Sequence, residues 1–270
     1  MYLDYYGFHV PPFAITSDPS FIFYSKRHQE AFDHLVYGIR NRVGFVEITG
    51  EIGCGKTTLC RALLNHLGED TKTAFILNSS LTETQLMQTL LHDLGLDPAK
   101  KNRYGLFSML NRFLIDQLLR GNNVVMIIDE AQNLSVRLLE QIRMLSNLET
   151  EKEKLIQIVL VGQPELRDKL RSPALKQLRQ RIAVRYHIGP LDEGEVGAYI
   201  RHRMSLAGAN GAGPVFASDA VSEIHRFSGG VPRLVNVLCD KTLLLSYVNS
   251  TREVTRDMVE QSAREIEGKN

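Results

Sequence analysis

Cysteine is scarce in this sequence, and long apolar runs are missing from it. The three cysteines, Cys54, Cys60 and Cys239, form neither a CxxC pair nor a metal-ligand spacing. This excludes a disulfide-stapled scaffold, and a sparse, odd set of thiols is typical of a reducing compartment. No run approaches about 18 consecutive apolar residues, so the sequence predicts no membrane-spanning helix.

An excess of charge of one sign is also lacking, because the formal net charge is only +1. This excludes a global field that would draw the chain to nucleic acid or to an anionic membrane, although a local basic patch is compatible with it. Residues 1–13 lack the basic and apolar regions of a secretory signal. We therefore expect the chain in the cytoplasm, and leave open its docking on a partner at the inner face of the membrane.

Residues 1–24 are unusually rich in aromatic residues and proline. So much aromatic surface is not expected to stay in water, and we interpret the segment as an irregular arm packed on the domain that follows. Ser25 is a candidate N-cap for a helix that runs to about residue 42. We assign this arm and helix, residues 1–43, to that domain.

Strand and helix patterns alternate between residues 44 and 190. The run Val124-Val125-Met126-Ile127-Ile128 is continuously apolar, as in a strand of a parallel sheet that is covered on both faces. Strands are expected at 44–49, 73–77 (ending in a polar turn at 78–80), 124–128, 156–161 and 184–188. Helices are expected at 56–67, from Thr82, at 106–120 and at 138–148. The alternation predicts an α/β core with a mostly parallel sheet over residues 44–190.

After Pro190 the pattern changes to helical periods alone. Helices are expected at about 192–206, 217–227, 232–248 and 255–266. The sequence therefore predicts a domain boundary near Pro190 and a small all-helical unit over residues 191–270.

Residues 50–57 read Gly-Glu-Ile-Gly-Cys-Gly-Lys-Thr and fit the pattern G-x-x-x-x-G-K-[ST] without a gap. Glycines let the backbone wrap closely around phosphate, and the amino end of the following helix favours an anion. Lys56 is expected to reach the β- and γ-phosphates of ATP, and Thr57 to bind Mg²⁺. A chance glycine-rich turn is the alternative, but the strand and helix predicted on either side supply the required context. The predicted nucleotide-binding residues are Gly50, Glu51, Gly53, Cys54, Gly55, Lys56, Thr57 and Thr58.

Two carboxylates, Asp129 and Glu130, directly follow the apolar strand at 124–128. A carboxylate beside a buried strand is costly unless it has a function. Asp129 is predicted to hold Mg²⁺, directly or through water, and Glu130 to orient and deprotonate the attacking water. The alternative is a helix-start pair stabilised by the helix dipole. Together with residues 50–57, the pair favours hydrolysis over phosphoryl transfer to a metabolite.

The order of these motifs resembles AAA+ ATPases, and more narrowly the ATPase domain of the general secretion pathway protein A (ExeA-like) and MSHA-pilus biogenesis group. The resemblance covers nearly the whole chain. It rests on residues 6–8, 12–13, 18–19, 50–58, 129–134, 145–150, 161–166, 177–182 and 229–233. It implies a P-loop parallel-sheet domain followed by a helical lid, Mg²⁺-ATP as cofactor, and a nucleotide-dependent ring or partial ring of identical subunits.

The resemblance also implies roles for two further residues. Gln163, after the strand at 156–161, matches the sensor-1 position, where a polar side chain helps to hold the water or the γ-phosphate. A simple turn residue is the alternative. Arg181 matches the arginine finger that reaches a neighbour's γ-phosphate, and Arg179 and Arg185 compete for that role. For all three arginines the alternative is a solvated basic strand edge.

Arg233 follows Pro232 and so falls in the first turn of a predicted helix, where a cation opposes the helix dipole and suggests an anionic partner. It matches the sensor-2 arginine of the lid, with a lone surface arginine as the alternative. Cys54 departs from the family, which commonly has a hydroxyl residue there. A thiol near a helix amino end can have a lowered pKa and become open to oxidation, or Cys54 is only a small residue that fits.

The resemblance implies that the ATPase drives or gates assembly of a bacterial envelope machine, either a type II secretion pore or a type IV pilus-like system. It also implies a partner at the inner membrane. One alternative is a DNA-associated ATPase resembling the transposition regulators, although the charge balance does not favour DNA. Another is a nucleotide-gated scaffold with negligible turnover.

Family members usually continue into a membrane span and a periplasmic peptidoglycan-binding domain, whereas this sequence stops at Asn270. We expect either a short family member or the cytoplasmic part of a longer protein.

Overall fold

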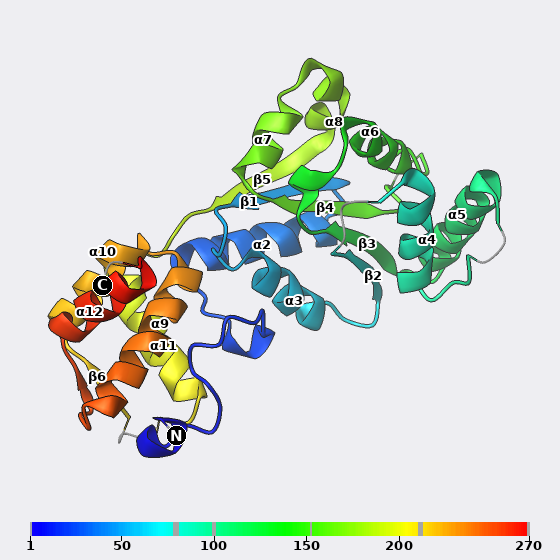
Figure 1. The fold of residues 1–270 in the computed structure, drawn as a ribbon. Coiled ribbons are helices and arrows are strands. Elements are labelled where there is room, and N and C mark those ends of the chain that lie inside the picture. Colours follow the sequence, from blue (N-terminus) through cyan, green and yellow to red (C-terminus); the bar gives the residue numbers. More distant parts are fainter. Residues whose placement is uncertain (1, 78–80, 99–100, 152, 210–212, 269–270) are drawn as a thin grey trace. The chain divides into compact units, whose positions relative to one another are not determined.

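The computed structural model describes residues 2–77, 81–98, 101–151, 153–209 and 213–268 (Figure 1). The chain divides into two compact units. The sheet unit comprises Arg27–Gly50 and Leu59–Ile188, and the helical unit comprises Met1–Lys26, Glu51–Thr58 and Gly189–Asn270. The turn predicted at 78–80 lies outside the described residues. Within those residues, no helix is both long and apolar enough to cross a membrane.

The sheet unit is built on five parallel strands, which confirms the prediction of an α/β fold with a parallel sheet. They are β1 (Phe45–Gly50), β2 (Thr71–Ile76), β3 (Asn123–Ile128), β4 (Gln157–Gly162) and β5 (Ile182–Ile188), in the order β2-β3-β4-β1-β5. Strand β4 therefore separates β1 from β3. Because all five strands run the same way, β1, β3 and β4 end at the same edge of the sheet.

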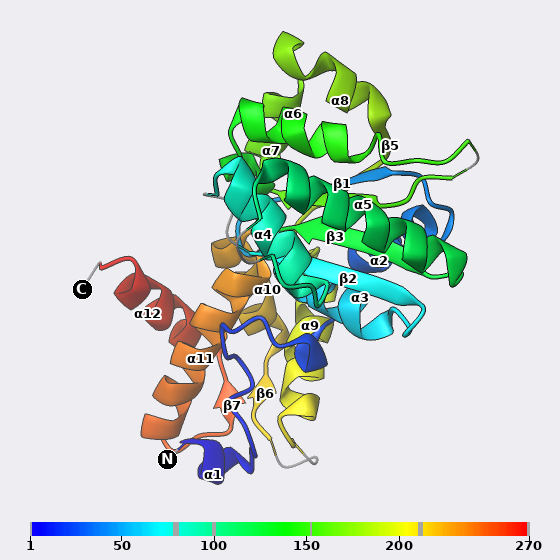
Figure 2. The same cartoon turned by 90° about the vertical axis from the view of Figure 1, so that its right-hand side faces the viewer.

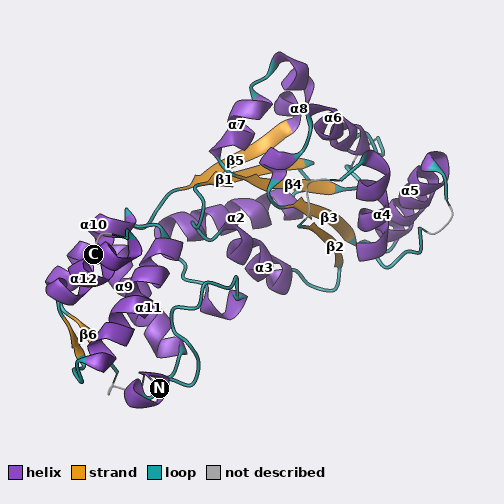
Figure 3. Ribbon diagram, viewed as in Figure 1, coloured by secondary structure: helices purple, strands orange, loops and turns teal. Residues whose placement is uncertain are grey.

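Helices cover both faces of this sheet (Figure 3). They are α2 (Lys26–Arg40), α3 (Lys56–His66), α4 (Glu83–Asp93), α5 (Arg103–Leu119), α6 (Val136–Leu145), α7 (Pro164–Leu170) and α8 (Lys176–Arg181). Helices α6 and α7 lie on one face and α2 lies on the other, as Figures 1 and 2 show. Strands β1 and β4 are buried along their whole length. This suits the nearly continuous apolar run of β4, whereas β1 also carries two buried polar residues, Glu47 and Thr49.

The helical unit contains α9 (Glu193–Leu206), α10 (Ser218–Ser228), α11 (Pro232–Val248) and α12 (Arg256–Ile266). The aromatic arm packs with these helices, because Tyr6, Phe8 and Phe13 are buried in one apolar cluster with residues of α9, α10 and α11. Arg203 of α9 is also buried and donates hydrogen bonds to the carbonyl oxygens of Pro12 (2.5 Å) and Ala14 (3.0 Å). Polar and apolar contacts thus hold residues 1–26 to this unit.

The arm and the C-terminal region contain more regular structure than the sequence predicted. A short helix, α1 (Tyr2–Tyr6), and a 3₁₀ turn at Pro19–Phe21 interrupt the arm. The prediction of helices alone after residue 190 was wrong, since β6 (Val215–Phe216) and β7 (Glu253–Val254) pair in parallel. Strands of two residues are too short to produce a detectable sequence period.

Candidate functional site

The phosphate-loop candidate begins at Glu51, the residue after β1, and ends where α3 begins at Lys56. Gly53 and Gly55 have φ angles of +82° and +84°, in the left-handed region that favours glycine. The Lys56 side chain is buried, and its Nζ donates to the Glu51 carbonyl oxygen at 2.9 Å. The loop therefore curls around the stem of Lys56, and Thr57 follows in the first turn of α3.

Within the helical unit, the start of α11 contacts this loop at Gly53. The backbone N–H of Arg233 donates to the Gly53 carbonyl oxygen at 3.2 Å. A Cβ added at Gly53 would lie 2.7 Å from the Arg233 Cβ, so no larger residue fits without movement. The structure thus brings together the loop and Arg233, two elements that lie 180 positions apart in the sequence.

Asp129 and Glu130 follow β3 at the carboxyl edge of the sheet. The Asp129 backbone N–H donates to the Ile76 carbonyl oxygen at 2.9 Å, and the Glu130 backbone N–H donates to the Asp129 Oδ1 at 2.9 Å. Asp129 is 2% exposed, and Glu130 adopts a left-handed conformation with φ +53°. A non-glycine residue in this region is strained, and such strain concentrates at functional sites. The register places the ends of β3 and β1 on either side of β4.

An amide network holds the Glu130 carboxylate. Gln163, the residue after β4, donates from Nε2 to the Glu130 Oε2 at 3.1 Å. Gln132, in the 3₁₀ turn Ala131–Asn133, donates to the same oxygen at 2.5 Å. Glu130 and Gln163 were both predicted site residues, and the structure brings them together. Sequence reasoning did not single out Gln132, although it lies within the motif at 129–134.

Arg181, the last residue of α8, is hydrogen-bonded within the sheet unit. Its Nη1 donates to the Ser146 Oγ at 2.6 Å and to the Asn147 Oδ1 at 2.5 Å, just after the carboxyl end of α6. A cation is favoured at that end of a helix. In the described structure Arg181 thus has partners of its own chain, and its assignment as a finger stays a prediction.

The two competing arginines also have partners. Arg185 Nε lies 3.2 Å from the Oε2 of Glu47, which is 3% exposed in the middle of β1. Burial raises the pKa of the Glu47 carboxyl, and the charge of Arg185 opposes that shift. Arg179 donates to the Arg171 carbonyl oxygen at 3.3 Å. Arg185 is therefore the counter-ion of a buried carboxylate.

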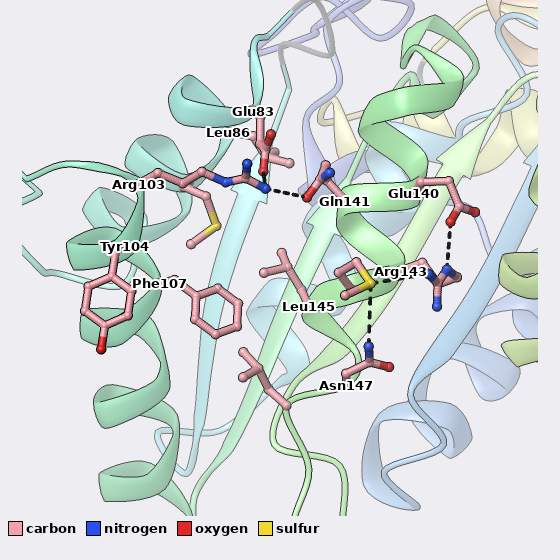
Figure 4. Close-up of a pocket in the computed structure, with 13 residues that line it drawn as sticks. Glu83, Leu86, Arg103, Tyr104, Phe107, Glu140, Gln141, Arg143, Leu145 and Asn147 are labelled. Atoms are coloured by element: carbon pink, nitrogen blue, oxygen red, sulfur yellow. Dashed lines mark hydrogen bonds and ion pairs between the residues drawn. The ribbon is translucent and has the colours of Figure 1, made fainter.

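A pocket of about 840 Å³ lies among α4, α5 and α6 (Figure 4). Apolar side chains including Leu86, Phe107 and Leu145 line it, and Asn147 lies at its edge. None of the predicted site residues lines this pocket, but Arg181 donates to the Asn147 side chain and to the Arg143 carbonyl oxygen, and both of these residues line it. It is therefore a separate feature from the carboxylate edge.

The donor set matches Mg²⁺ in chemical character. Magnesium in nucleotide sites is bound by one or two hard protein oxygens, substrate phosphates and water. The two residues predicted to bind Mg²⁺, Thr57 and Asp129, each carry an oxygen of this kind, and Asp129 is a buried carboxylate at the end of a strand. In the part of the chain that the structure describes, no group of three or more His, Cys, Asp or Glu side chains could hold a metal ion alone.

Comparison with known proteins gives two sequence matches. A family model described as an AAA domain matches residues 39–170. General secretion pathway protein A of Aeromonas hydrophila is 42% identical over 269 residues, which are 99% of this chain and 49% of that protein. This chain thus spans about half the length of that relative.

Solved structures with a similar fold are far more distant in sequence. CDC6P from Pyrobaculum aerophilum has a TM-score of 0.70 at 17% identity, over 92% of this chain and 70% of that one. The ORC2 protein of Aeropyrum pernix, in ADPNP-ADP complexes, has a TM-score of 0.63 at 14% identity, over 89% and 67%. The RuvB Holliday junction branch migration motor of Thermotoga maritima has a TM-score of 0.60 at 18% identity, over 90% of this chain and 69% of that one.

Likenesses at these identities show the fold alone, and that fold is the one predicted from the motifs. The relative from Aeromonas matches along nearly the whole chain, which confirms the resemblance seen in the sequence. Residues 39–170 therefore match an AAA domain, the fold is that of P-loop ATPases, and nearly the whole chain is similar to about half of general secretion pathway protein A.

Proposed function

We propose that this chain binds Mg²⁺-ATP and hydrolyses it to ADP and phosphate. The observation that carries the proposal is the Glu130 carboxylate, which is held by two amides at the edge of the sheet where β1 leads into the phosphate loop. A carboxylate base is what hydrolysis needs, because the attacking water must lose a proton. The two sequence matches are consistent with this chemistry.

In the proposed reaction, each predicted site residue has one task. Lys56 and the loop N–H groups would bind the phosphates, while Thr57 and Asp129 would hold Mg²⁺, which would stabilise charge on the phosphate oxygens. Glu130 accepts a proton from the water while the oxygen of that water attacks the γ-phosphorus. The bond between the γ-phosphorus and the ADP oxygen breaks in this step. Gln163 donates to that water or to the γ-phosphate, and Arg233 senses which nucleotide is bound.

Glu130→Gln tests the proposal directly. The amide cannot accept a proton, so we expect turnover to fall by at least about 100-fold. ATP affinity should stay within about threefold of wild type, or roughly 0.7 kcal/mol. Phosphate release and equilibrium binding of a fluorescent ATP analogue give the two quantities. Glu69→Gln, an exposed substitution in the loop before β2, is the matched control. Wild-type turnover in the Glu130→Gln protein would refute Glu130 as the base.

We further propose that the ATPase cycle drives or gates assembly of a bacterial envelope machine, at the cytoplasmic face of the inner membrane and as a homo-oligomer. The support is the relative, which is named as a general secretion pathway protein. Co-purification with membrane partners from the host, in ATP and in ADP, tests it. If no such partner co-purifies in either ATP or ADP, that result would count against the assembly role.

The basic stretch from Lys169 to Arg185 bears on the alternative of a DNA-associated ATPase. Lys169 donates to the Leu134 carbonyl oxygen at 2.8 Å, and Arg181 and Arg185 have the partners described above. Intrachain contacts thus account for much of the stretch without nucleic acid. ATP-stimulated DNA binding that weakens steeply with salt would nevertheless favour the alternative.

A further inference from the structure

We propose that Gln132 is a positioning residue for the Glu130 carboxylate, which it ties to the amino end of α7. The inference rests on the proposed role of Glu130 as the base. It adds a residue that neither the motif pattern nor the family resemblance assigned to the site, and it specifies which carboxylate oxygen takes the proton.

The Gln132 side chain uses both ends of its amide. Its Nε2 donates to the Glu130 Oε2, while its Oε1 accepts from the Gln163 backbone N–H at 3.1 Å. Bridging a carboxylate and an N–H requires a donor and an acceptor on one planar group, which a glutamine has and a glutamate or methionine lacks. Gln132 therefore links the turn after β3 to the residue after β4.

Glu130 needs such a link because its own backbone does not favour its position. It occupies the left-handed region, a conformation that persists in non-glycine residues only when the surroundings enforce it. Gln132 and Gln163 both donate to Oε2, and a carboxylate oxygen has two lone pairs with which to accept them. A proton taken from water would consequently go to Oε1, and the amides would define which oxygen faces the water.

The surroundings also fix Gln132 itself. Lys169 of α7 donates to the Gln132 carbonyl oxygen, as well as to that of Leu134 at 2.8 Å. At the end of β4, Gly162 leaves room for the amide, because a Cβ there would lie 2.8 Å from the Gln132 Oε1. The hydrogen bond from Lys169 thus fixes the Gln132 backbone, and the missing side chain at Gly162 leaves room for the Gln132 amide. Both features are expected of a residue that orients another.

Three variants test the inference from different directions. Gln132→Met keeps the side-chain length and removes the amide, and Gln132→Asn keeps an amide that is too short. Gly162→Ala crowds the amide from outside, and it crowds Leu166 as well. Misplacing a catalytic group by about 1 Å can cost 10²-fold in rate. We therefore expect kcat to fall by about 10- to 100-fold in each, with the KM for ATP within about threefold of wild type. Gln29→Met, which removes an exposed amide on α2, is the control.

A double-mutant cycle with Glu130→Gln separates positioning from a merely structural role. If Gln132 acts through Glu130, adding Gln132→Met to Glu130→Gln should not lower the residual rate further. An additive loss would show that Gln132 acts elsewhere and would overturn the inference. So would wild-type kcat in Gln132→Met while Glu130→Gln is inactive. Wild-type turnover in Glu130→Gln alone would instead refute the proposed base, so the two failures are distinguishable.

Discussion

At the scale of single residues, the proposed phosphate loop and the proposed catalytic base each include a residue with a left-handed backbone conformation. Gly53 in the phosphate loop and Glu130 after β3 have φ angles of +82° and +53°. Gly53 adopts this conformation without strain, whereas Glu130 does so at a cost that its amide partners offset. The sequence motif explains the glycine, but the strain at Glu130 is visible only in the backbone.

Gly53→Ala should impair nucleotide binding specifically. The new Cβ would meet the Arg233 Cβ at 2.7 Å, so the loop and the start of α11 must move apart. We expect ATP affinity to fall by more than about tenfold, equivalent to about 1.4 kcal/mol. Gly121→Ala is the matched control, since Gly121 has φ +78° and nothing within 4 Å of an added Cβ.

Both substitutions carry the left-handed penalty of about 1 to 2 kcal/mol in folding stability. Isothermal titration with ATP and thermal unfolding separate that shared cost from the clash. Equal ATP affinities in the two variants would show that the contact with Arg233 is unimportant for the loop.

At the scale of an element, the arginines of α8 and β5 serve different contacts. Arg181 donates to groups at the carboxyl end of α6, and Arg185 is paired with Glu47 inside the sheet unit. The family resemblance assigned the finger to Arg181 and left Arg185 as a competitor, because linear spacing does not reveal which side of an element a residue faces. The buried carboxylate makes Arg185 a stability residue.

Arg185→Met should destabilise the protein, and more at neutral than at acidic pH. Burial raises the pKa of the Glu47 carboxyl in the folded state, so this carboxyl binds a proton more readily in the native chain than in the unfolded chain. The contribution of Glu47 to stability therefore falls as the pH rises between the unfolded and the folded pKa. Losing the Arg185 charge raises the folded pKa further and widens this window.

We expect a loss of about 1 to 3 kcal/mol at pH 7.5 from the unpaired carboxylate, shrinking as the pH is lowered toward 5. Urea denaturation at both pH values measures it. Adding Glu47→Gln should remove the pH dependence of the loss. A loss that is the same at both pH values would mean that Arg185 stabilises the strand by packing alone.

At the scale of the whole molecule, catalysis by a ring would need groups from neighbouring copies. The proposed finger, Arg181, now donates to Ser146 and Asn147 of its own chain. To reach a neighbour's γ-phosphate it must exchange these hydrogen bonds for that anion. An arginine supplied from a neighbour can contribute about 10³- to 10⁵-fold in rate.

Arg181→Ala should therefore bind ATP normally and hydrolyse it poorly. Mixing it with Glu130→Gln should restore part of the activity, since a mixed interface can pair an intact Glu130 with a donated Arg181. Turnover per chain of the wild type should rise with protein concentration. Equilibrium binding of a fluorescent ATP analogue measures the affinity, and phosphate release across a dilution series measures the three activities. Flat activity per chain together with an inactive mixture would assign Arg181 to the α6 contact alone.

The sequence alone was enough to predict the parallel α/β fold, the glycine-rich loop between β1 and α3, and the position of two carboxylates directly after β3. These features depend on local chemistry, namely apolar runs covered on both faces and glycines that permit left-handed backbone. Long, strongly patterned elements such as β1 and α11 were predicted to within a few residues of their observed ends. Two-residue strands and the short helix α1 were missed, because too few residues carry their pattern.

Tertiary structure alone decided which residues meet. The contacts between Gly53 and Arg233, between Gln132 and Gln163, and between Glu47 and Arg185 join positions far apart in the chain. So does the packing of the aromatic arm on the C-terminal helices. Within the sheet unit, strand order creates such meetings, since β4 enters between β1 and β3 only after the chain has passed both. A single sequence gives the residue types that follow each strand. Which of these residues become neighbours at the edge of the sheet depends on how the strands are ordered in space.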